Sequence, residues 1–190
     1  MKLETLYKTL GDDAVLLPVP KGKKKPPIDK WERLTLADTK TRKFQRALAW
    51  SAEHGNIALR HGPNIQSIDI DDDELIEPFL KLNPSLRNTS QTKGKRGCQF
   101  HVRMTGDYPN EKGIYKIAHK TKRDRNGRPL TVMELRVGGT KGSTSIVSGT
   151  HPDGITYQLN GKQPVKIEFN TIECPPECVL NAINSPCRRC

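Results

Sequence analysis

The stretch from residue 66 to 73, Gln-Ser-Ile-Asp-Ile-Asp-Asp-Asp, constrains the fold of this chain more than any other. Two isoleucines alternate with Asp69 and Asp71, and strand side chains alternate between the two faces of a sheet. The pattern therefore predicts a strand whose isoleucines pack in the core while both carboxylates share the opposite face. Adjacent carboxylates repel each other, and a hard divalent cation such as Mg²⁺ or Mn²⁺, which prefers oxygen ligands, offsets that repulsion.

Apolar periodicity along the rest of the chain predicts an α/β (α+β) domain. Apolar residues at intervals of three and four indicate helices, and strict alternation indicates strands. Asp72 or Asp73 is expected to cap the helix that follows the acidic strand. Helices are expected at residues 1–10, 40–53 and 73–82, and strands at 14–19, 56–60, 66–71, 98–104, 131–137, 145–148 and 155–159. Residues 164–169 are expected to close the domain.

The net charge of +11 points to a polyanionic partner, with nucleic acid favoured over a membrane. No apolar run approaches the roughly 20 residues that span a bilayer, and the N-terminus lacks a secretory signal. A cytoplasmic protein without a membrane partner is therefore expected. A stiff loop between prolines is a candidate contact to phosphate or to template DNA, and the alternative is that it is only a solvated surface. The lysines of that loop are Lys21, Lys23, Lys24 and Lys25. Further lysines lie at 112–122.

Two further strands carry polar faces, and each adjoins a loop rich in glycine and lysine. Gln99 shares a face with His101, and Glu134 shares a face with Arg136. Carboxylates on separate strands can hold two divalent ions, which stabilise the attacking and leaving oxygens of a phosphoryl transfer. The adjoining loops suit the phosphates of a nucleoside triphosphate. The basic candidates in these loops are Lys93, Lys95, Arg96 and Lys141.

The order of these motifs resembles the primase-polymerase (prim-pol) domain of plasmid and phage replication proteins, which belongs to the archaeo-eukaryotic primase superfamily. That family has an Asp-x-Asp strand, a small-polar-x-His strand and a single carboxylate on a third strand. Here these look like Asp-Ile-Asp at 69–71, Gln-Phe-His at 99–101 and Glu134. The likeness covers roughly residues 14–168. One departure is Gln99, where the family commonly has a serine.

The resemblance implies a primase-like catalytic core with mixed sheets, whose second half resembles an RNA-recognition fold. It also implies template-directed nucleotidyl transfer by a DNA primase, a DNA polymerase or both, from dNTPs or NTPs on single-stranded or primed DNA. Asp69, Asp71 and Glu134 would ligate two Mg²⁺ or Mn²⁺ ions. The residues expected around the nucleotide are Lys93, Arg96, Gln99, His101, Arg136, Lys141 and His151. For His151, stabilising a His-Pro-Asp-Gly turn is the alternative.

The end of the chain is interpreted as a separate feature. A catalytic domain is expected at 1–170, and a cysteine-rich tail at 171–190. A small four-cysteine zinc site is one interpretation of this tail, and a disordered or partner-dependent segment is the other. The cysteines in question are Cys174, Cys178, Cys187 and Cys190.

Two other classes of function fit the same residues. One is a non-polymerising DNA-binding module for replication initiation, and the other is a metal-dependent phosphodiesterase or nuclease. Two glycine-lysine loops and a strand histidine favour binding of a nucleoside triphosphate over hydrolysis. The choice between dNTPs and NTPs, priming without a primer, and an attached helicase are left open by the sequence.

Overall fold

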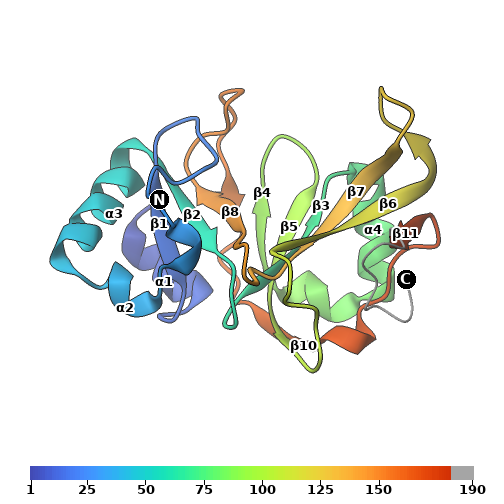
Figure 1. The fold of residues 1–190 in the computed structure, drawn as a ribbon, viewed down its shortest axis with the longest axis horizontal. Coiled ribbons are helices and arrows are strands. Elements are labelled where there is room, and N and C mark those ends of the chain that lie inside the picture. Colours follow the sequence, from blue (N-terminus) through green and yellow to red (C-terminus); the bar gives the residue numbers. More distant parts are fainter. Residues whose placement is uncertain (181–190) are drawn as a thin grey trace.

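The computed structural model describes residues 1–180, which form two halves that lie side by side (Figure 1). The smaller half is built on a three-stranded antiparallel sheet in the order β1-β2-β8. Its elements are α1 (Leu3–Leu10), β1 (Val15–Val19), η1 (Trp31–Arg33), α2 (Leu36–Thr39), α3 (Arg42–His54), β2 (Asn56–Arg60) and β8 (Thr144–Ser148).

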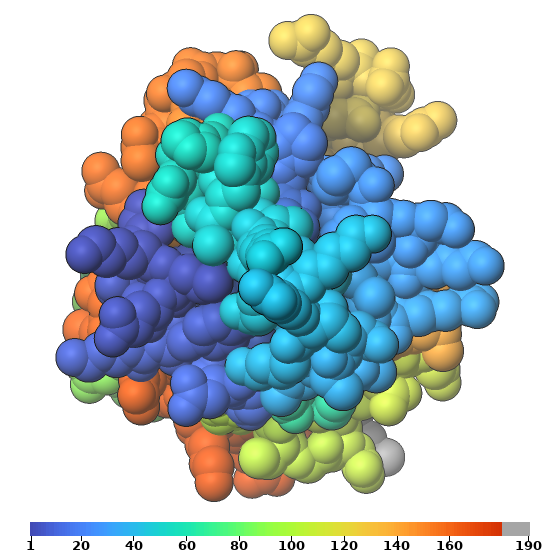
Figure 2. Space-filling model, turned by 90° about the vertical axis from the view of Figure 1, so that its left-hand side faces the viewer, coloured from blue at the N-terminus to red at the C-terminus, as the bar shows by residue number. Residues whose placement is uncertain are grey.

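Amphipathic helices cover this small sheet. Leu6 and Leu10 of α1 and Leu48 of α3 are fully buried against apolar residues of β1, β2 and β8. The Thr41 hydroxyl accepts a hydrogen bond from the Phe44 N–H and so caps α3, which ends at Gly55. Figure 2 shows that residues of these helices form the outer surface on this side of the molecule. The helices at the start of the chain therefore complete a core of their own.

The larger half is an eight-stranded sheet in the order β11-β6-β7-β3-β5-β4-β9, with β10 paired to β5 in parallel. The other pairs in it are antiparallel. Its strands are β3 (Gln66–Ile70), β4 (Ser90–Lys93), β5 (Cys98–Thr105), β6 (Ile114–Arg123), β7 (Pro129–Arg136), β9 (Gln158–Leu159), β10 (Val165–Glu168) and β11 (Cys178–Leu180). The expected mixed α+β class is confirmed.

One face of this sheet is apolar and is covered by α4 (Asp73–Leu82) and the 3-10 helix η2 (Pro84–Asn88). Ile70 and Phe79 are fully buried there, and the rings of Phe79 and Phe100 lie 5.7 Å apart. Asp72 caps α4 by accepting a hydrogen bond from the Glu74 N–H. It is one of the two residues that the sequence offered as candidates for this cap. This packing leaves the alternate residues of β3, β5 and β7 on the opposite face.

Antiparallel register aligns the polar residues of that opposite face in two rows. The row members are Thr92, Gln99, Asp69 and Glu134 in the first row, and Ser90, His101, Ser67 and Arg136 in the second. Because cross-strand partners lie only about 5 Å apart, groups distant in the sequence become neighbours here. The predicted polar faces therefore meet on one surface.

The chain crosses between the two halves more than once. After β7 it returns to the small sheet as β8, and it then rejoins the large sheet through β9 and β10. A long β6–β7 hairpin rises from the far side of the large sheet (Figure 1). The strand expected at 155–159 is shorter than predicted, because only Gln158–Leu159 pairs with β4, while Thr156 forms an isolated bridge to Thr150.

The described part of the predicted tail packs on the large half. The 3-10 helix η3 (Phe169–Thr171) leads to Ile172, which is buried in the same core as Cys178. Strand β11 pairs with β6 at the edge of the sheet. No helix among residues 1–180 is long and apolar enough to cross a membrane.

Candidate active site

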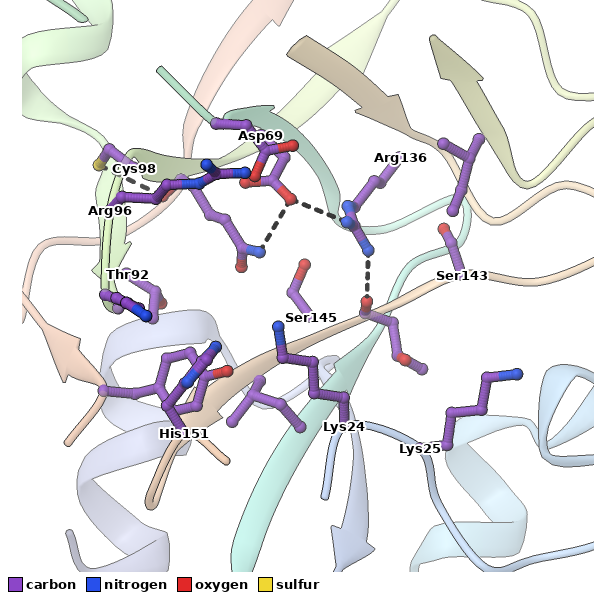
Figure 3. Close-up of a pocket in the computed structure, with 18 of the residues that line it drawn as sticks. Lys24, Lys25, Asp69, Thr92, Arg96, Cys98, Arg136, Ser143, Ser145 and His151 are labelled. Carbon is purple, nitrogen blue, oxygen red and sulfur yellow. Dashed lines mark hydrogen bonds and ion pairs between the residues drawn. The ribbon is translucent and has the colours of Figure 1, made fainter. Parts of the chain in front are cut away.

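A cavity of about 660 Å³ opens between the two sheets, and both halves supply its walls. Asp69 and Arg136 come from the large sheet, Ser145 from β8 of the small sheet, and Lys24 from the proline-bounded loop. Lys24 points toward the centre of the pocket from the side opposite Asp69 (Figure 3). The cavity thus lies against the polar rows of the large sheet.

Asp69 and Arg136 form the centre of this cavity. Asp69 is only 6% exposed, and its Oδ2 lies 2.8 Å from Arg136 Nη2. The same Nη2 lies 2.8 Å from Glu134 Oε2. Gln99 Nε2 donates to Asp69 Oδ2 at 3.1 Å, and Arg136 Nη1 donates to the Thr144 carbonyl at 2.9 Å. One guanidinium therefore holds two carboxylates and ties them to the opposite sheet.

The acid at position 69 resists ionisation in this arrangement. Burial raises the pKa of Asp69 from 3.8 to about 6, against the lowering influence of Arg136. The nearby carboxylates of Asp71 and Glu134 raise it further, and the hydrogen bond from Gln99 lowers it. These shifts show that three carboxylates interact electrostatically here and that added positive charge would stabilise them.

The donor set of this centre fits hard divalent cations in its chemistry. Carboxylate oxygens of Asp69, Asp71 and Glu134 are the ligands that Mg²⁺ and Mn²⁺ prefer. Burial is the largest cause of the raised pKa of Asp69, and a bound cation would lower that pKa by stabilising the ionised carboxylate. Across residues 1–180, however, no three His, Cys, Asp or Glu side chains are gathered as ligands of one metal ion. In this structure Arg136 supplies the positive charge instead.

Cationic side chains surround the carboxylates. They are Lys24, Lys25, Lys95, Arg96 and Lys141. Lys95 also forms an ion pair of 2.7 Å with Asp153, which joins the β4–β5 loop to the loop after β8. A ligand bound here would meet positive charge from three separate loops, which suits a polyanion.

Most of the residues predicted from sequence line this cavity. Those that do are Asp69, Asp71, Arg96, Gln99, Arg136, Lys141 and His151. Glu134 reaches the site through Arg136 rather than lining the cavity itself. Lys93 and His101, both described, lie outside the lining.

The strand register explains the position of Lys93. It follows Thr92 directly in β4, so the two side chains point to opposite faces of the sheet. Thr92 faces the cavity, whereas Lys93 acts on Glu77 of α4. The hydrogen bond from Arg87 is the main cause that lowers the pKa of Glu77, and the charge of Lys93 contributes to a lesser extent. The predicted triphosphate contact by Lys93 is not supported by this placement.

His101 is fully buried beneath the cavity instead of exposed to it. Its Nδ1 lies 2.7 Å from Ser67 Oγ, and its Nε2 lies 2.8 Å from Thr92 Oγ1. Burial lowers the pKa of His101 to about 3, which keeps the ring neutral. A direct contact to phosphate, as predicted, would require the ring to leave these two hydroxyls; Thr92 lies between it and the cavity.

His151 stabilises its turn and also reaches the cavity, and its contact to a nucleotide stays a prediction. It lines the cavity, and its Nδ1 accepts a hydrogen bond of 3.1 Å from the Asp153 N–H within the turn. Its ring also lies 5.8 Å from the ring of Tyr157. The turn therefore positions the imidazole at the rim.

Sequence reasoning did not single out the hydroxyl residues of the cavity. Serine, threonine and tyrosine are common residues, so no sequence pattern marks these positions as part of a site. Several of them reach the cavity only because β8 packs close to the large sheet. The hydroxyl residues of the cavity are Thr92, Ser143, Thr144, Ser145 and Tyr157. Ser145 Oγ and Gln99 Oε1 are buried without a hydrogen-bond partner among the described residues.

The structure describes part of the cysteine cluster. Cys178 is buried, with its Sγ 3.8 Å from Met133 Sδ, and Cys174 packs against the same core. Cys187 and Cys190 lie outside the described residues. The zinc site therefore stays a prediction.

The geometry can be compared with known families. A search of curated proteins returned no match. A model of the Prim-Pol family, described as bifunctional DNA primase/polymerase, N-terminal, matches residues 9–178 of the 190. That range contains both halves and every cavity residue named above. The chain therefore belongs to the Prim-Pol family of DNA primase/polymerases.

Proposed function

We propose that this chain catalyses template-directed nucleotidyl transfer on single-stranded or primed DNA, using dNTPs or NTPs and two divalent cations. The observation that carries the proposal is the buried Asp69–Arg136–Glu134 centre inside a cavity rimmed by lysine and arginine. A nucleoside triphosphate bound to cations has the matching charge pattern.

Asp69, Asp71 and Glu134 are the residues that would hold the cations. When bound, such ions lower the pKa of an attacking hydroxyl and offset charge on the transferred phosphoryl group. Arg136 contacts Asp69 and Glu134 and would orient these carboxylates for the cations. Because Asp69 is deeply buried, water competes little for its oxygens.

The cationic rim would bind the triphosphate. Lys24 and Lys141 come from loops of the small half and of the β7–β8 connection, whereas Arg96 comes from the β4–β5 loop. Charges converging from separate loops suit a ligand whose charge is spread over many oxygens. The Lys95–Asp153 ion pair ties the β4–β5 loop to the loop after β8.

DNA would follow the basic surface beside the cavity. The net charge is +11, and the β6–β7 hairpin carries an exposed basic run at 120–123. Contacts to phosphates release counterions and make binding fall steeply with salt. The hairpin and the proline-bounded loop are the two candidate elements for this contact.

The test is incorporation of labelled dNTPs or NTPs with Mg²⁺ or Mn²⁺ and single-stranded DNA, with and without a primer. Asp69→Asn and Glu134→Gln should each abolish product while leaving DNA binding in place. Glu53→Gln is the matched control, because Glu53 is exposed on α3 and pairs only with its neighbour His54 in the described chain.

Three outcomes separate the alternatives. Product formation that depends on both carboxylates supports the proposal. DNA binding without incorporation under any metal or nucleotide indicates a non-polymerising initiation module. Metal-dependent cleavage of labelled DNA in the absence of nucleotides indicates a nuclease.

A further inference from the structure

A continuous chain of hydrogen bonds runs beneath the cavity from one edge to another. Ser143 Oγ lies 3.1 Å from His61 Nδ1, and His61 Nε2 lies 2.8 Å from Ser67 Oγ. Ser67 Oγ lies 2.7 Å from His101 Nδ1, and His101 Nε2 lies 2.8 Å from Thr92 Oγ1. Ser143 and Thr92 line the cavity, whereas the three residues between them are fully buried.

Both rings of this chain are neutral. Burial lowers the pKa of His101 to about 3 and lowers the pKa of His61 well below 6.5. The positive charges of Arg136 and Arg60 lower the pKa of His61 further. A neutral imidazole carries one N–H and one acceptor nitrogen, so each ring donates on one side and accepts on the other.

The hydrogen count and the burial of Ser67 together leave the chain two polarities. Three hydroxyls and two neutral rings carry one hydrogen each, and the four links use all but one of them. Ser67 could accept from both rings, but its own hydrogen would then lack an acceptor in a fully buried position, which is costly. Ser67 therefore donates its single hydrogen to one ring and accepts from the other. Both rings then carry their hydrogen on the same atom, Nε2 in one polarity and Nδ1 in the other. The remaining hydroxyl hydrogen lies at Thr92 in the first polarity and at Ser143 in the second.

We propose that His61, Ser67 and His101 form a relay that sets which edge of the cavity offers a hydroxyl donor to a bound polyphosphate. His61 and Ser67 are positioning residues, since neither lines the cavity. The inference depends on the proposed function in one respect only, namely that the bound polyphosphate belongs to a nucleotide.

The surroundings select the Thr92 edge for the phosphates. Lys95 and Arg96 follow Thr92 closely in the β4–β5 segment and line the same cavity. At the other end, Ser143 Oγ already accepts the Gly138 N–H at 3.1 Å. An ionised phosphate oxygen is an acceptor only, so it needs the Thr92 hydroxyl as a donor. Bound polyphosphate therefore selects the polarity in which both rings are Nε2–H.

The direct test is nitrogen-15 NMR of the histidine rings at neutral pH, with and without tripolyphosphate. The expected result is one shared tautomer for His61 and His101, and the Nε2–H form on both when tripolyphosphate is bound. Opposite tautomers on the two rings, a protonated ring at pH 7, or the Nδ1–H form in the bound state would overturn the relay.

A binding experiment tests the same idea in the full chain. Ser67→Ala removes the middle of the relay and should weaken tripolyphosphate binding about tenfold, because a hydrogen bond to a charged group loses its orientation. Thr92→Val should cost a similar factor, and the double variant no more than either. Additive losses, or no tripolyphosphate binding by the parent protein, would overturn the proposal.

Ser90→Ala is the matched control. Ser90 is fully buried, lies opposite His101 in the strand pairing, and its hydroxyl has no partner among the described residues. Its replacement should leave tripolyphosphate affinity unchanged. These measurements need neither template nor catalysis. A protein that does not incorporate nucleotides but shows the same tautomer on both rings would overturn only the proposed function. A protein that incorporates nucleotides but shows opposite tautomers would overturn only the relay.

Discussion

Replacing Asp69 by asparagine should stabilise the metal-free protein at neutral pH, although it should abolish activity. Asp69 is 6% exposed, and burial raises its pKa from 3.8 to about 6. A carboxyl with a raised pKa in the folded state favours folding when it is protonated. That contribution is fully present below pH 4 and is lost as the pH rises through about 6.

The size of the effect follows from the two pKa values. Each pH unit of difference corresponds to about 1.4 kcal/mol, so the ionised carboxylate costs the folded state up to about 3 kcal/mol above pH 6. Asparagine removes this cost and still offers an acceptor oxygen to Arg136. The difference in the free energy of unfolding between variant and parent should therefore grow from near zero at pH 4 toward this limit at pH 8.

The assay is denaturant unfolding in the presence of a chelator across this pH range. Asp107→Asn is the matched control, because Asp107 is exposed in the β5–β6 connection. Adding Mg²⁺ should stabilise the parent more than the Asp69→Asn variant, since ligand binding stabilises the folded state. A variant that is less stable than the parent at pH 8, or a difference that does not change with pH, would refute the reasoning.

Two further predictions concern the walls of the cavity. Gly97 has φ +69°, and a Cβ there would lie 1.9 Å from the Ile70 carbonyl oxygen. Gly97→Ala should therefore lower the melting temperature and abolish nucleotide binding. Gly127 also has a positive φ (+75°) but lies in open space, so the control Gly127→Ala should cost only about 1 kcal/mol in thermal unfolding. Lys24 lines the cavity and Lys21 does not. Lys24→Ala should therefore weaken nucleotide binding about tenfold in a titration, and Lys21→Ala should leave the affinity unchanged. Equal affinities of the two variants would indicate that the loop is only solvated or binds DNA.

The sequence alone predicted most of the longer helices and strands and the acidic strand at the centre of the site. Alternation over 66–71 correctly predicts that the isoleucines enter the core while Asp69 faces a polar surface. The same rule places Gln99 and Arg136 on that surface. These predictions succeed because side-chain alternation, helical periodicity and capping depend on residues close together in the chain.

Only the tertiary structure decided what covers that surface. Strand β8 leaves the large half and pairs with β2, which brings Ser143 and Ser145 over the polar rows and closes the cavity. His101 is fully buried and hydrogen-bonded to Ser67 and Thr92, whereas the sequence suggested that it faces the nucleotide. Strand partners and the depth of a polar group depend on contacts between distant segments, and no local pattern encodes them.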